Sequence, residues 1–201
     1  MITPLLNTIL IVIMFSFMIF IVVTMHKRNK HIITKKASVS DTAIESRNIY
    51  RLLFELALKI KANNIALFRF HNGGHYKNNF PMNKFTCIME VRTGGLTKPM
   101  QDDYNGVLVE RYAESMSCLT YLDEYFVTDI EFCNDKKIQD DANKYGHKSI
   151  YLFLIRQLNG EPEAFIGVNY YALTKMSNED KTEVRMLHNK ILNGLNMVKE
   201  K

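Results

Sequence analysis

An apolar, uncharged segment near the start of the chain constrains the fold more than any other feature. From Leu5 to Met25 the sequence LLNTILIVIMFSFMIFIVVTM carries no charged side chain. At 1.5 Å per residue, about twenty helical residues cross the hydrocarbon core of a bilayer, which is about 30 Å thick. The segment lacks the basic start and the small-residue exit of a cleaved signal peptide. We therefore expect residues 1–26 to form an uncleaved transmembrane anchor.

A basic stretch follows this segment directly. Its five cations are Lys27, Arg28, Lys30, Lys35 and Lys36. Residues 1–36 contain no Asp or Glu, and from Ala37 onward 21 basic residues balance 21 acidic ones, so the whole formal charge of +5 lies beside the anchor. Positive charge at this place faces phospholipid headgroups and marks the cytoplasmic side. A stop-transfer signal and a specific site for an anionic lipid both explain it.

These charges predict the location and some partners of the protein. We expect residues 27–40 to be a juxtamembrane linker and the rest to lie on the cytoplasmic side of the inner (plasma) membrane, with the lipid bilayer as a partner. A nucleic-acid binder would carry its positive charge on the folded domain, so we expect no nucleic-acid partner. The cysteines Cys87, Cys118 and Cys133 form no C-x-x-C pair. They fit a reducing compartment, or one disulfide with a free thiol.

The remaining sequence alternates between helical and strand patterns. Capping-box spacing at Thr42 and Glu45, followed by apolar residues at helical spacing, predicts a helix over 41–62. NIALFRFHNGG reads as a strand that ends in a turn. Over residues 83–92, strict alternation predicts a strand with Phe85, Cys87, Met89 and Val91 on one face and Lys84, Thr86, Ile88, Glu90 and Arg92 on the other.

The second half of the chain yields six further elements. We predict a helix over 102–116, a strand over 125–131 and a short polar helix over 135–145. SIYLFLIRQ and EAFIGVNYY then form a hairpin, because Asn159-Gly160 between them is a strong turn signal. Ser177 caps a last helix whose apolar stripe is Val184, Leu187, Ile191, Leu195 and Val198.

This order of elements predicts one α/β (α+β) domain over residues 41–199. The sheet is mostly antiparallel, and the two terminal helices pack together on one of its faces. The pattern resembles the GAF domain, a relative of the PAS sensor fold. The resemblance rests on helix 41–62, IALFRFHNGG, the hairpin with Phe165-Ile166-Gly167-Val168, and the capped last helix. It implies a pocket between the sheet and its covering loops, which in that family holds a cyclic nucleotide, a chromophore or another small molecule, or is empty. It also implies a homo-oligomer formed through the terminal helices.

A second resemblance is to the T-type holins of large tailed phages. It rests on the hairpin followed by the capped helix, in YYALTKMSNEDKTEVRMLHNKILNGL. In that family the soluble domain is periplasmic and binds an antiholin that delays lysis. This chain departs from the pattern because its anchor starts almost at residue 1 and its basic flank predicts the opposite orientation. The FHNGG stretch is also similar to phage proteins.

The stretch Arg69-x-His71-Asn72-Gly73-Gly74-His75 is the candidate ligand-binding site. A strand end that brings Arg69, His71 and Asn72 to a glycine turn places hydrogen-bond donors around an anionic or polar ligand, and Gly73 lets backbone amides approach. Lys84 and Glu90 reach the same mouth if the two strands pair. A tight turn held by its own hydrogen bonds is the alternative interpretation.

No enzyme motif stands in the sequence: it has no G-x-S-x-G elbow, P-loop, H-E-x-x-H or dinucleotide fingerprint. Adjacent carboxylates at Asp102-Asp103 and Asp140-Asp141 do not face each other on a helix, so they predict an N-cap and a solvated surface. His71 and His75 lack further ligands, so we expect no metal and no cofactor. We predict a non-catalytic, membrane-anchored GAF-like sensory module that binds a small molecule or a protein, with the holin as the alternative.

Overall fold

The computed structural model describes residues 18–19, 39–75, 81–94 and 98–198. The predicted anchor (except Met18 and Ile19), the linker up to residue 38 and its five cations lie outside the described residues. Within the described part of the chain, no helix is both long enough and apolar enough to cross a bilayer.

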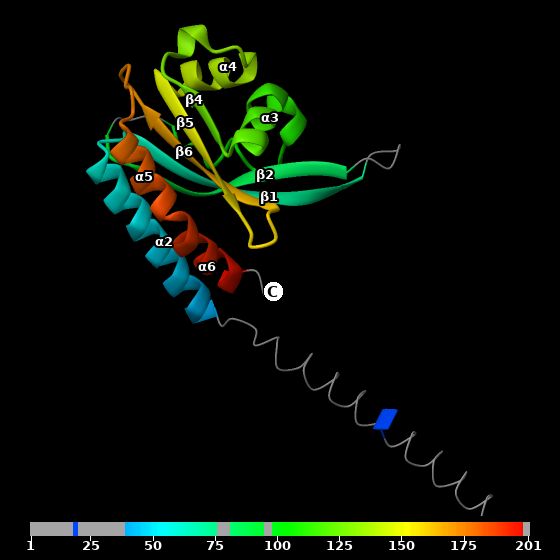
Figure 1. Ribbon diagram of the computed structural model, residues 1–201. Helices are drawn as coiled ribbons and strands as arrows, with labels where there is room; N and C mark the ends of the chain where they lie inside the picture. Colours follow the sequence, from blue (N-terminus) through cyan, green and yellow to red (C-terminus); the bar gives the residue numbers. More distant parts are fainter. Residues whose placement is uncertain (1–17, 20–38, 76–80, 95–97, 199–201) are drawn as a thin grey trace, which may run out of the picture.

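A six-stranded antiparallel sheet forms the centre of the domain. Its strand order is β3-β2-β1-β6-β5-β4. The strands are β1 (Asn64–His75), β2 (Pro81–Arg92), β3 (Val107–Leu108), β4 (Glu124–Val127), β5 (Ser149–Arg156) and β6 (Pro162–Tyr170). The β1–β2 hairpin extends well beyond the rest of the sheet (Figure 1).

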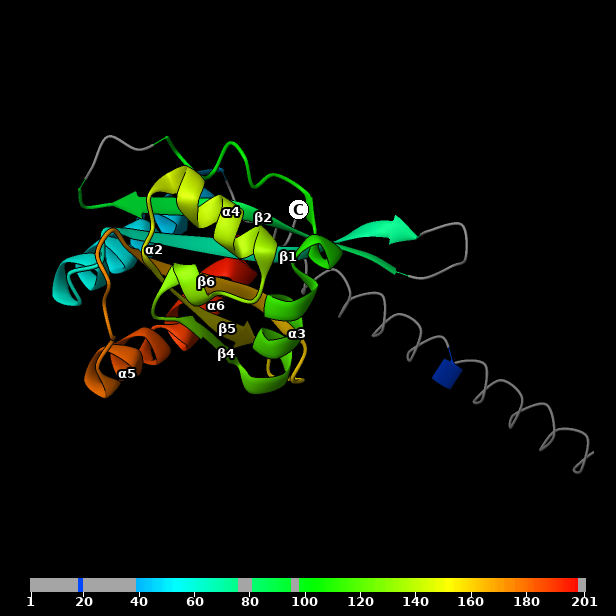
Figure 2. The same cartoon turned by 90° about the horizontal axis from the view of Figure 1, so that it is seen from above.

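Helices cover both faces of this sheet (Figures 1 and 2). On one face lie the terminal helices α2 (Val39–Lys59), α5 (Asn178–Met186) and α6 (His188–Val198). The other face is covered by α3 (Ala113–Leu122) and α4 (Lys136–Tyr145), with the short 3₁₀ helices η1 (Val109–Tyr112) and η2 (Ile130–Phe132). The predicted α+β class, with the terminal helices packed together on one face, is confirmed.

Strand periodicity divides the core into two halves. Along β5, Tyr151, Phe153 and Ile155 pack with the terminal helices, whereas Ile150 and Leu152 pack with α3 and α4. Successive strand residues point to opposite faces, and both faces of β5 are covered. The continuous apolar sequence of β5 therefore supplies side chains to both halves of the core.

Close packing joins the two terminal helices. On α6, a Cβ atom at Gly194 would lie 2.9 Å from the Cδ1 atom of Ile49 on α2, so any larger residue at this position requires the buried Ile49 side chain to shift. The N-cap predicted at Ser177 for the last helix is confirmed, because the Asp180 amide donates to Ser177 Oγ at 3.1 Å. The predicted final helix is divided at Leu187 into α5 and α6. The predicted helix over 41–62 is confirmed as α2, but the cap predicted at Thr42 is wrong, because Thr42 lies within this helix.

The predicted helix over 102–116 is wrong in its first half. Residues 98–106 form a loop, β3 and η1 follow, and α3 begins only at Ala113. The Gly106 backbone has a φ of +64° and its amide donates to Thr86 Oγ1 at 2.9 Å. Pairing of Val107 and Leu108 with β2 then replaces helical hydrogen bonds. The predicted strand over 125–131 ends at Val127.

A β-bulge changes which residues of β2 share a face. Phe68 pairs with Cys87 and Leu67 with Met89, so Ile88 is an extra residue in the strand. The predicted common face is therefore wrong. Cys87 belongs to the core half under α3 and α4, while Met89 packs against the half under the terminal helices.

The hairpin of β5 and β6 is confirmed, with a different turn. Only Gly160 of the Asn159-Gly160 pair adopts a positive φ, +86°. The Gly160 amide donates to the Gln157 carbonyl at 2.9 Å, and the Gln157 amide donates to the Glu161 carbonyl at 2.8 Å. The two strands are therefore joined by a three-residue loop with glycine in the left-handed conformation. Such loops are the next commonest hairpin connection after the two-residue turn.

Candidate functional site

A small cavity lies between the sheet and a cover that we call the roof, made of residues 98–106, η1, α3 and α4. Its volume is about 40 Å³. The lining is mostly apolar and draws on β1, β2, β5 and β6 below and on the roof above. The lining residues are Phe68, Phe85, Met100, Tyr104, Tyr112, Met116, Ile138, Asp141, Ala142, Tyr145, His147, Ile150, Leu152, Phe165, Gly167 and Asn169.

Aromatic rings form the floor of this cavity. Phe68 and Phe165 stack with their centroids 4.6 Å apart, and Phe85 meets both rings edge-on. Gly167 leaves space beside Phe68, because a Cβ atom at this position would lie 3.3 Å from that ring. The floor is therefore a rigid apolar surface with a gap at a glycine.

Two buried polar side chains line the cavity. His147 is 3% exposed and is stacked between the rings of Tyr145 and Tyr171. Burial lowers its pKa to about 4, so the ring is neutral at pH 7. Its ring nitrogens have no hydrogen-bond partner within the described part of the chain. Asn169, also 3% exposed, donates from Nδ2 to Asn64 Oδ1 at 2.8 Å.

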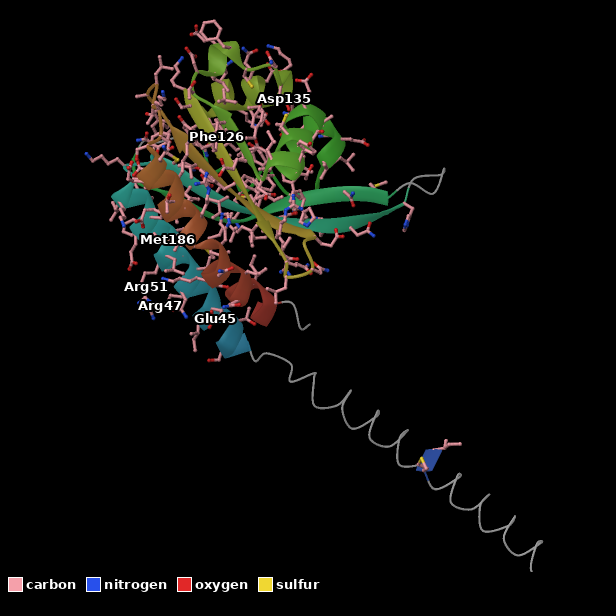
Figure 3. The ribbon with its side chains drawn as sticks, in the orientation of Figure 1. Glu45, Arg47, Arg51, Phe126, Asp135 and Met186 are labelled. Carbon is pink, nitrogen blue, oxygen red and sulfur yellow. The ribbon has the colours of Figure 1, made fainter. Side chains whose placement is uncertain are left out.

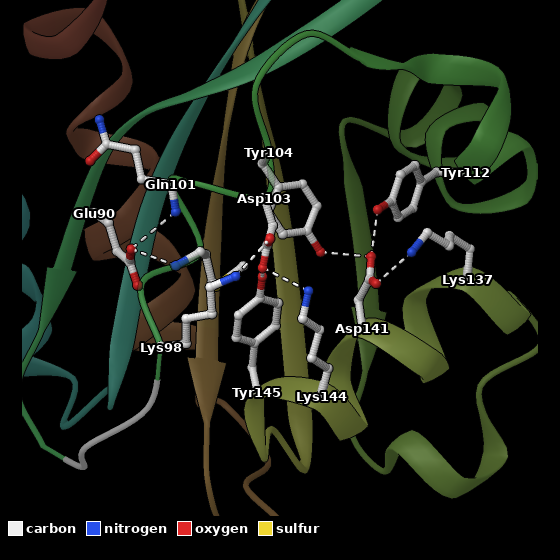
Figure 4. A network of polar contacts seen from close by, with 11 residues as sticks. Glu90, Lys98, Gln101, Asp103, Tyr104, Tyr112, Lys137, Asp141, Lys144 and Tyr145 are labelled. Carbon is white, nitrogen blue, oxygen red and sulfur yellow. Dashed lines mark hydrogen bonds and ion pairs between the residues drawn. The ribbon is translucent and has the colours of Figure 1, made fainter.

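Two carboxylates hold the roof together (Figure 4). Asp141 on α4 accepts from the Tyr104 hydroxyl at 2.8 Å, from the Tyr112 hydroxyl at 2.5 Å and from Lys137 Nζ at 2.5 Å. These contacts tie residues 98–106 and η1 to α4. Since Asp141 itself lines the cavity, the network forms the cavity wall.

The second carboxylate is Asp103, in the loop. It accepts from Lys98 Nζ at 3.0 Å, from Lys144 Nζ at 2.7 Å and from the Tyr145 hydroxyl. Hydrogen bonds from Lys144, Tyr145 and Lys98 hold the pKa of Asp103 well below its usual range. Outside this wall lies a hollow of about 160 Å³ that shares Asp141 and Tyr145 with the cavity.

Two tyrosines of the cavity wall, and Cys87 in the same half of the core, keep their protons at neutral pH. Burial, followed by the neighbouring carboxylates and hydroxyls, raises the pKa of Tyr104, and burial followed by Asp103 does the same for Tyr145. Burial and then Glu90 raise the pKa of Cys87 to about 12. These side chains are therefore hydrogen-bond donors, and Cys87 is not a reactive thiolate.

The structure places most of the sequence-predicted site residues away from this cavity, on the projecting β1–β2 hairpin. Arg69 Nε donates to Glu163 at 3.1 Å, and His71 Nε2 lies 2.9 Å from Thr86 Oγ1. Asn72 Oδ1 accepts from the Gly74 amide at 2.8 Å. The contacts of His71 and Asn72 are thus within the hairpin, whereas Arg69 contacts β6.

Lys84 and Glu90 do not meet. Lys84 pairs with His71 and its side chain lies over Gly73, where a Cβ atom would be 2.7 Å from Lys84 Cε. Glu90 is displaced by the bulge and accepts from the Met100 amide at 2.8 Å and from Asn64 Nδ2 at 2.6 Å. Glu90 therefore anchors the roof loop, and the expectation that it shares a face with Lys84 is wrong.

Among the described residues, no group of three His, Cys, Asp or Glu side chains is arranged to hold a metal ion. Sequence reasoning missed Asp103 and Asp141 by assigning them to a cap and a solvated surface. One signal in the sequence could have indicated the contact of Asp141 with Lys137, because these two residues stand four positions apart on a predicted helix.

No protein-family model matches the sequence, and a search of curated proteins finds no relative. Solved structures do match. A far-red cyanobacteriochrome photoreceptor superimposes with a TM-score of 0.61 at 8% identity, covering 88% of this chain and 95% of that one. The phycoerythrobilin-bound GAF domain of a cyanobacterial phytochrome gives 0.55 at 11% identity, covering 79% and 94%.

The protein has a GAF-like fold. A type II free methionine-R-sulfoxide reductase from Thermoplasma acidophilum also matches this GAF-like domain, with a TM-score of 0.54 at 13% identity, covering 77% of this chain and 94% of that chain. Identities this low establish the fold alone, and one fold hosts many functions. The function must therefore be argued from the cavity and the roof.

Proposed function

We propose that this protein is a membrane-anchored, non-catalytic sensory module whose cavity binds a compact, uncharged, largely apolar small molecule. The observation that carries the proposal is His147, a neutral and almost fully buried imidazole that lines an aromatic cavity without a hydrogen-bond partner among the described residues. The ring nitrogens of His147 are not among the fully buried unpaired atoms of the described residues, which are Thr42 Oγ1 and His188 Nε2. A ligand in the cavity can therefore form with the imidazole a hydrogen bond that the described residues do not supply.

The size of the cavity limits the ligand. About 10–15 Å³ of such space holds one water molecule, so the observed volume of about 40 Å³ has room for about three water-sized groups. A single aromatic ring is larger than this and already requires some displacement of the roof, and a phycoerythrobilin-sized molecule requires much more. The Asp103 and Asp141 contacts are the ones that displacement would break, so they set the resistance to opening.

The chemistry of the lining favours binding over catalysis. An ionised ligand would lose its hydration against the rings of Phe68 and Phe165, and that loss is costly. The carboxylate of the lining, Asp141, is already paired with Lys137. Tyr104 and Cys87 have raised pKa values and therefore keep their protons. Neither is a nucleophile at neutral pH.

Signal output, in this proposal, passes through paired copies. On α2 five of the exposed residues follow one another at alternating spacings of three and four, the spacing of a coiled-coil seam, and three of the five are apolar. Ile44, Phe54 and Leu58 are 53%, 38% and 57% exposed. Arg47 and Arg51 occupy the intervening positions of this spacing, and both lie on the side of α2 away from α6 (Figure 3). We propose that two copies pair along this seam, with residues 1–26 in the membrane and the domain on its cytoplasmic side.

Ligand-dependent stabilisation tests the binding proposal. Full-length protein in detergent is melted with phenol, which pairs a ring with a hydrogen-bonding hydroxyl, and with benzene, which has the ring alone. At one hundred times its dissociation constant, a ligand stabilises the folded state by about 2.7 kcal/mol. We expect phenol to raise the melting temperature more than benzene does.

The matched variant is His147→Phe, which keeps an aromatic ring and removes the imidazole. It should bring the effect of phenol down to that of benzene. If neither compound stabilises the wild-type protein, or if phenol acts equally on both proteins, the cavity is ordinary core and the proposal is wrong.

A further inference from the structure

The three cysteines fall into two environments. Cys87 is 1% exposed in the core half under the roof, and its thiol donates to the Met89 carbonyl at 3.5 Å. Cys118, on α3, is exposed, and Cys133, directly after η2, is partly exposed. Cys118 and Cys133 are therefore the two cysteines that solvent can reach.

These two thiols line one open hollow of about 690 Å³. Its walls come from α3, from β4 at the edge of the sheet and from the connection between η2 and α4. The lining residues are Glu114, Ser117, Cys118, Tyr125, Phe126, Val127, Thr128, Asp129, Phe132, Cys133 and Asn134. Reagents in solution can reach both sulfurs from this side.

A hydrogen-bond chain brings the backbones that carry the two thiols together. Ser115 Oγ on α3 donates to Asp135 Oδ2 at 2.6 Å, and Asp135 is labelled in Figure 3 near the junction of α3 and α4. Cys118 follows Ser115 by three residues, so the two are neighbours on the helix surface. The Cys133 thiol donates to the Asp135 carbonyl at 3.4 Å. Asp135 thus links the turn of α3 before Cys118 to the segment that holds Cys133.

Tyr125 stands beside both sulfurs. Its hydroxyl lies 3.5 Å from Cys133 Sγ. Burial raises the pKa of Tyr125, followed by its hydrogen bond and charge interaction with Cys133, by Asp135 and by Cys118. A protonated phenol at this place can donate to a sulfur anion on Cys133.

We propose that Cys118 and Cys133 form a reversible intramolecular disulfide that joins α3 to the start of α4. A peroxide is the oxidant. The Cys118 thiolate attacks one peroxide oxygen, which breaks the O–O bond, releases water after proton uptake and leaves Cys118 as a sulfenic acid. The Cys133 thiolate then attacks that sulfur and expels hydroxide, which takes a proton to become a second water. Two thiols and one hydrogen peroxide thus give one disulfide and two waters.

The bond would constrain the roof. Met116 on α3 and Ile138 on α4 both line the cavity, so a covalent link between their helices restricts the separation that opening requires. The disulfide does not depend on any ligand in the cavity. Its formation and its effect on the cavity are therefore measured separately.

Mass spectrometry of the oxidised full-length protein tests this proposal. No Lys or Arg lies between Cys118 and Cys133, so trypsin leaves both in one peptide, whereas cleavage after Glu124 and Glu131 separates them. After treatment with hydrogen peroxide, we expect a linked peptide pair that reduction separates. The melting temperature should rise by several degrees on oxidation and fall back on reduction.

Single substitutions identify the pair. Cys87→Ser should retain the linked peptides, while Cys118→Ser and Cys133→Ser should abolish them together with the thermal shift. The proposal is overturned if peroxide converts Cys118 to sulfinic acid while Cys133 stays reduced. Links that contain Cys87, or that join Cys118 between two chains, would also overturn it.

Discussion

Asp141 gives the sharpest test of the roof, because the chain supplies a matched control one residue away. Both Asp141 and Asp140 stand four residues after a lysine on α4. The side chain of Asp141 is 14% exposed and bonds two tyrosines as well as Lys137, whereas that of Asp140 is 55% exposed and pairs with Lys136 alone. The substitutions Asp141→Asn and Asp140→Asn remove one charge each and keep the side-chain shape.

The expected cost follows from the contacts. Hydrogen bonds to a charged group contribute about 1.5–3 kcal/mol, and neutral ones about 0.5–1.5 kcal/mol. Making two tyrosine bonds neutral therefore costs about 1 kcal/mol each. The ion pair with Lys137, whose side chain is 41% exposed, adds at most about 1 kcal/mol. We expect Asp141→Asn to lower the free energy of unfolding by about 2–3 kcal/mol and Asp140→Asn by less than about 0.5 kcal/mol.

Urea titration of the full-length protein in detergent measures both values. For a domain of this size, about 2–3 kcal/mol corresponds to a fall of about 5–10 °C in the melting temperature. Equal effects of the two substitutions, in either direction, would refute the reasoning, because they would show that the two tyrosine contacts of Asp141 add nothing to the roof.

Four further predictions follow from other parts of the molecule. Gly194→Ala places a methyl group against α2 and should cost about 1–3 kcal/mol in the free energy of unfolding, measured by urea titration. The pKa of His147 is lowered to about 4, so the unfolded chain binds more protons than the folded one between about pH 6.5 and pH 4. As the pH falls through this range, His147 should therefore lower the stability by about 3 kcal/mol. His147→Phe should remove that part of the fall in the urea midpoint, and a further part remains because burial also lowers the pKa of His188. Leu58→Glu should convert a dimer to a monomer in light-scattering measurements, while Leu158→Glu, at the exposed hairpin loop, should not. Reporter fusions after Lys201 should be active only in the cytoplasm; activity in the periplasm would favour the holin alternative.

Elements that depend on local patterns were predictable from the sequence. The long helix α2 follows from apolar spacing, the hairpin of β5 and β6 from the Asn159-Gly160 turn signal, and the start of α5 from the Ser177 cap. The helix expected over 102–116 failed because pairing of Val107 with Phe85 on β2 overrides local spacing. The bulge at Ile88 is also non-local, since it appears only when β2 pairs with β1.

The candidate site was less predictable, because its contacts join distant segments. Tyr104 reaches Asp141 across 37 positions, and Tyr145 reaches Asp103 across 42. No spacing rule relates such residues. The glycine turn near Asn72 stood out in the sequence because it places histidines, an asparagine and two glycines next to one another. In the structure, Asn72 accepts a hydrogen bond from Gly74 within the same turn. Whether the turn also binds a ligand stays a prediction.

Native mass spectrometry of full-length protein, released gently from detergent, tests the central claim most directly. The account predicts a bound small neutral molecule that is lost when Ala142→Phe fills the cavity and retained in Asn72→Ala, which alters only the hairpin turn. Retention by Ala142→Phe with loss in Asn72→Ala would place the site on the hairpin and contradict the account. A wild-type protein that carries no small molecule, and gains none when phenol is added, would contradict it equally.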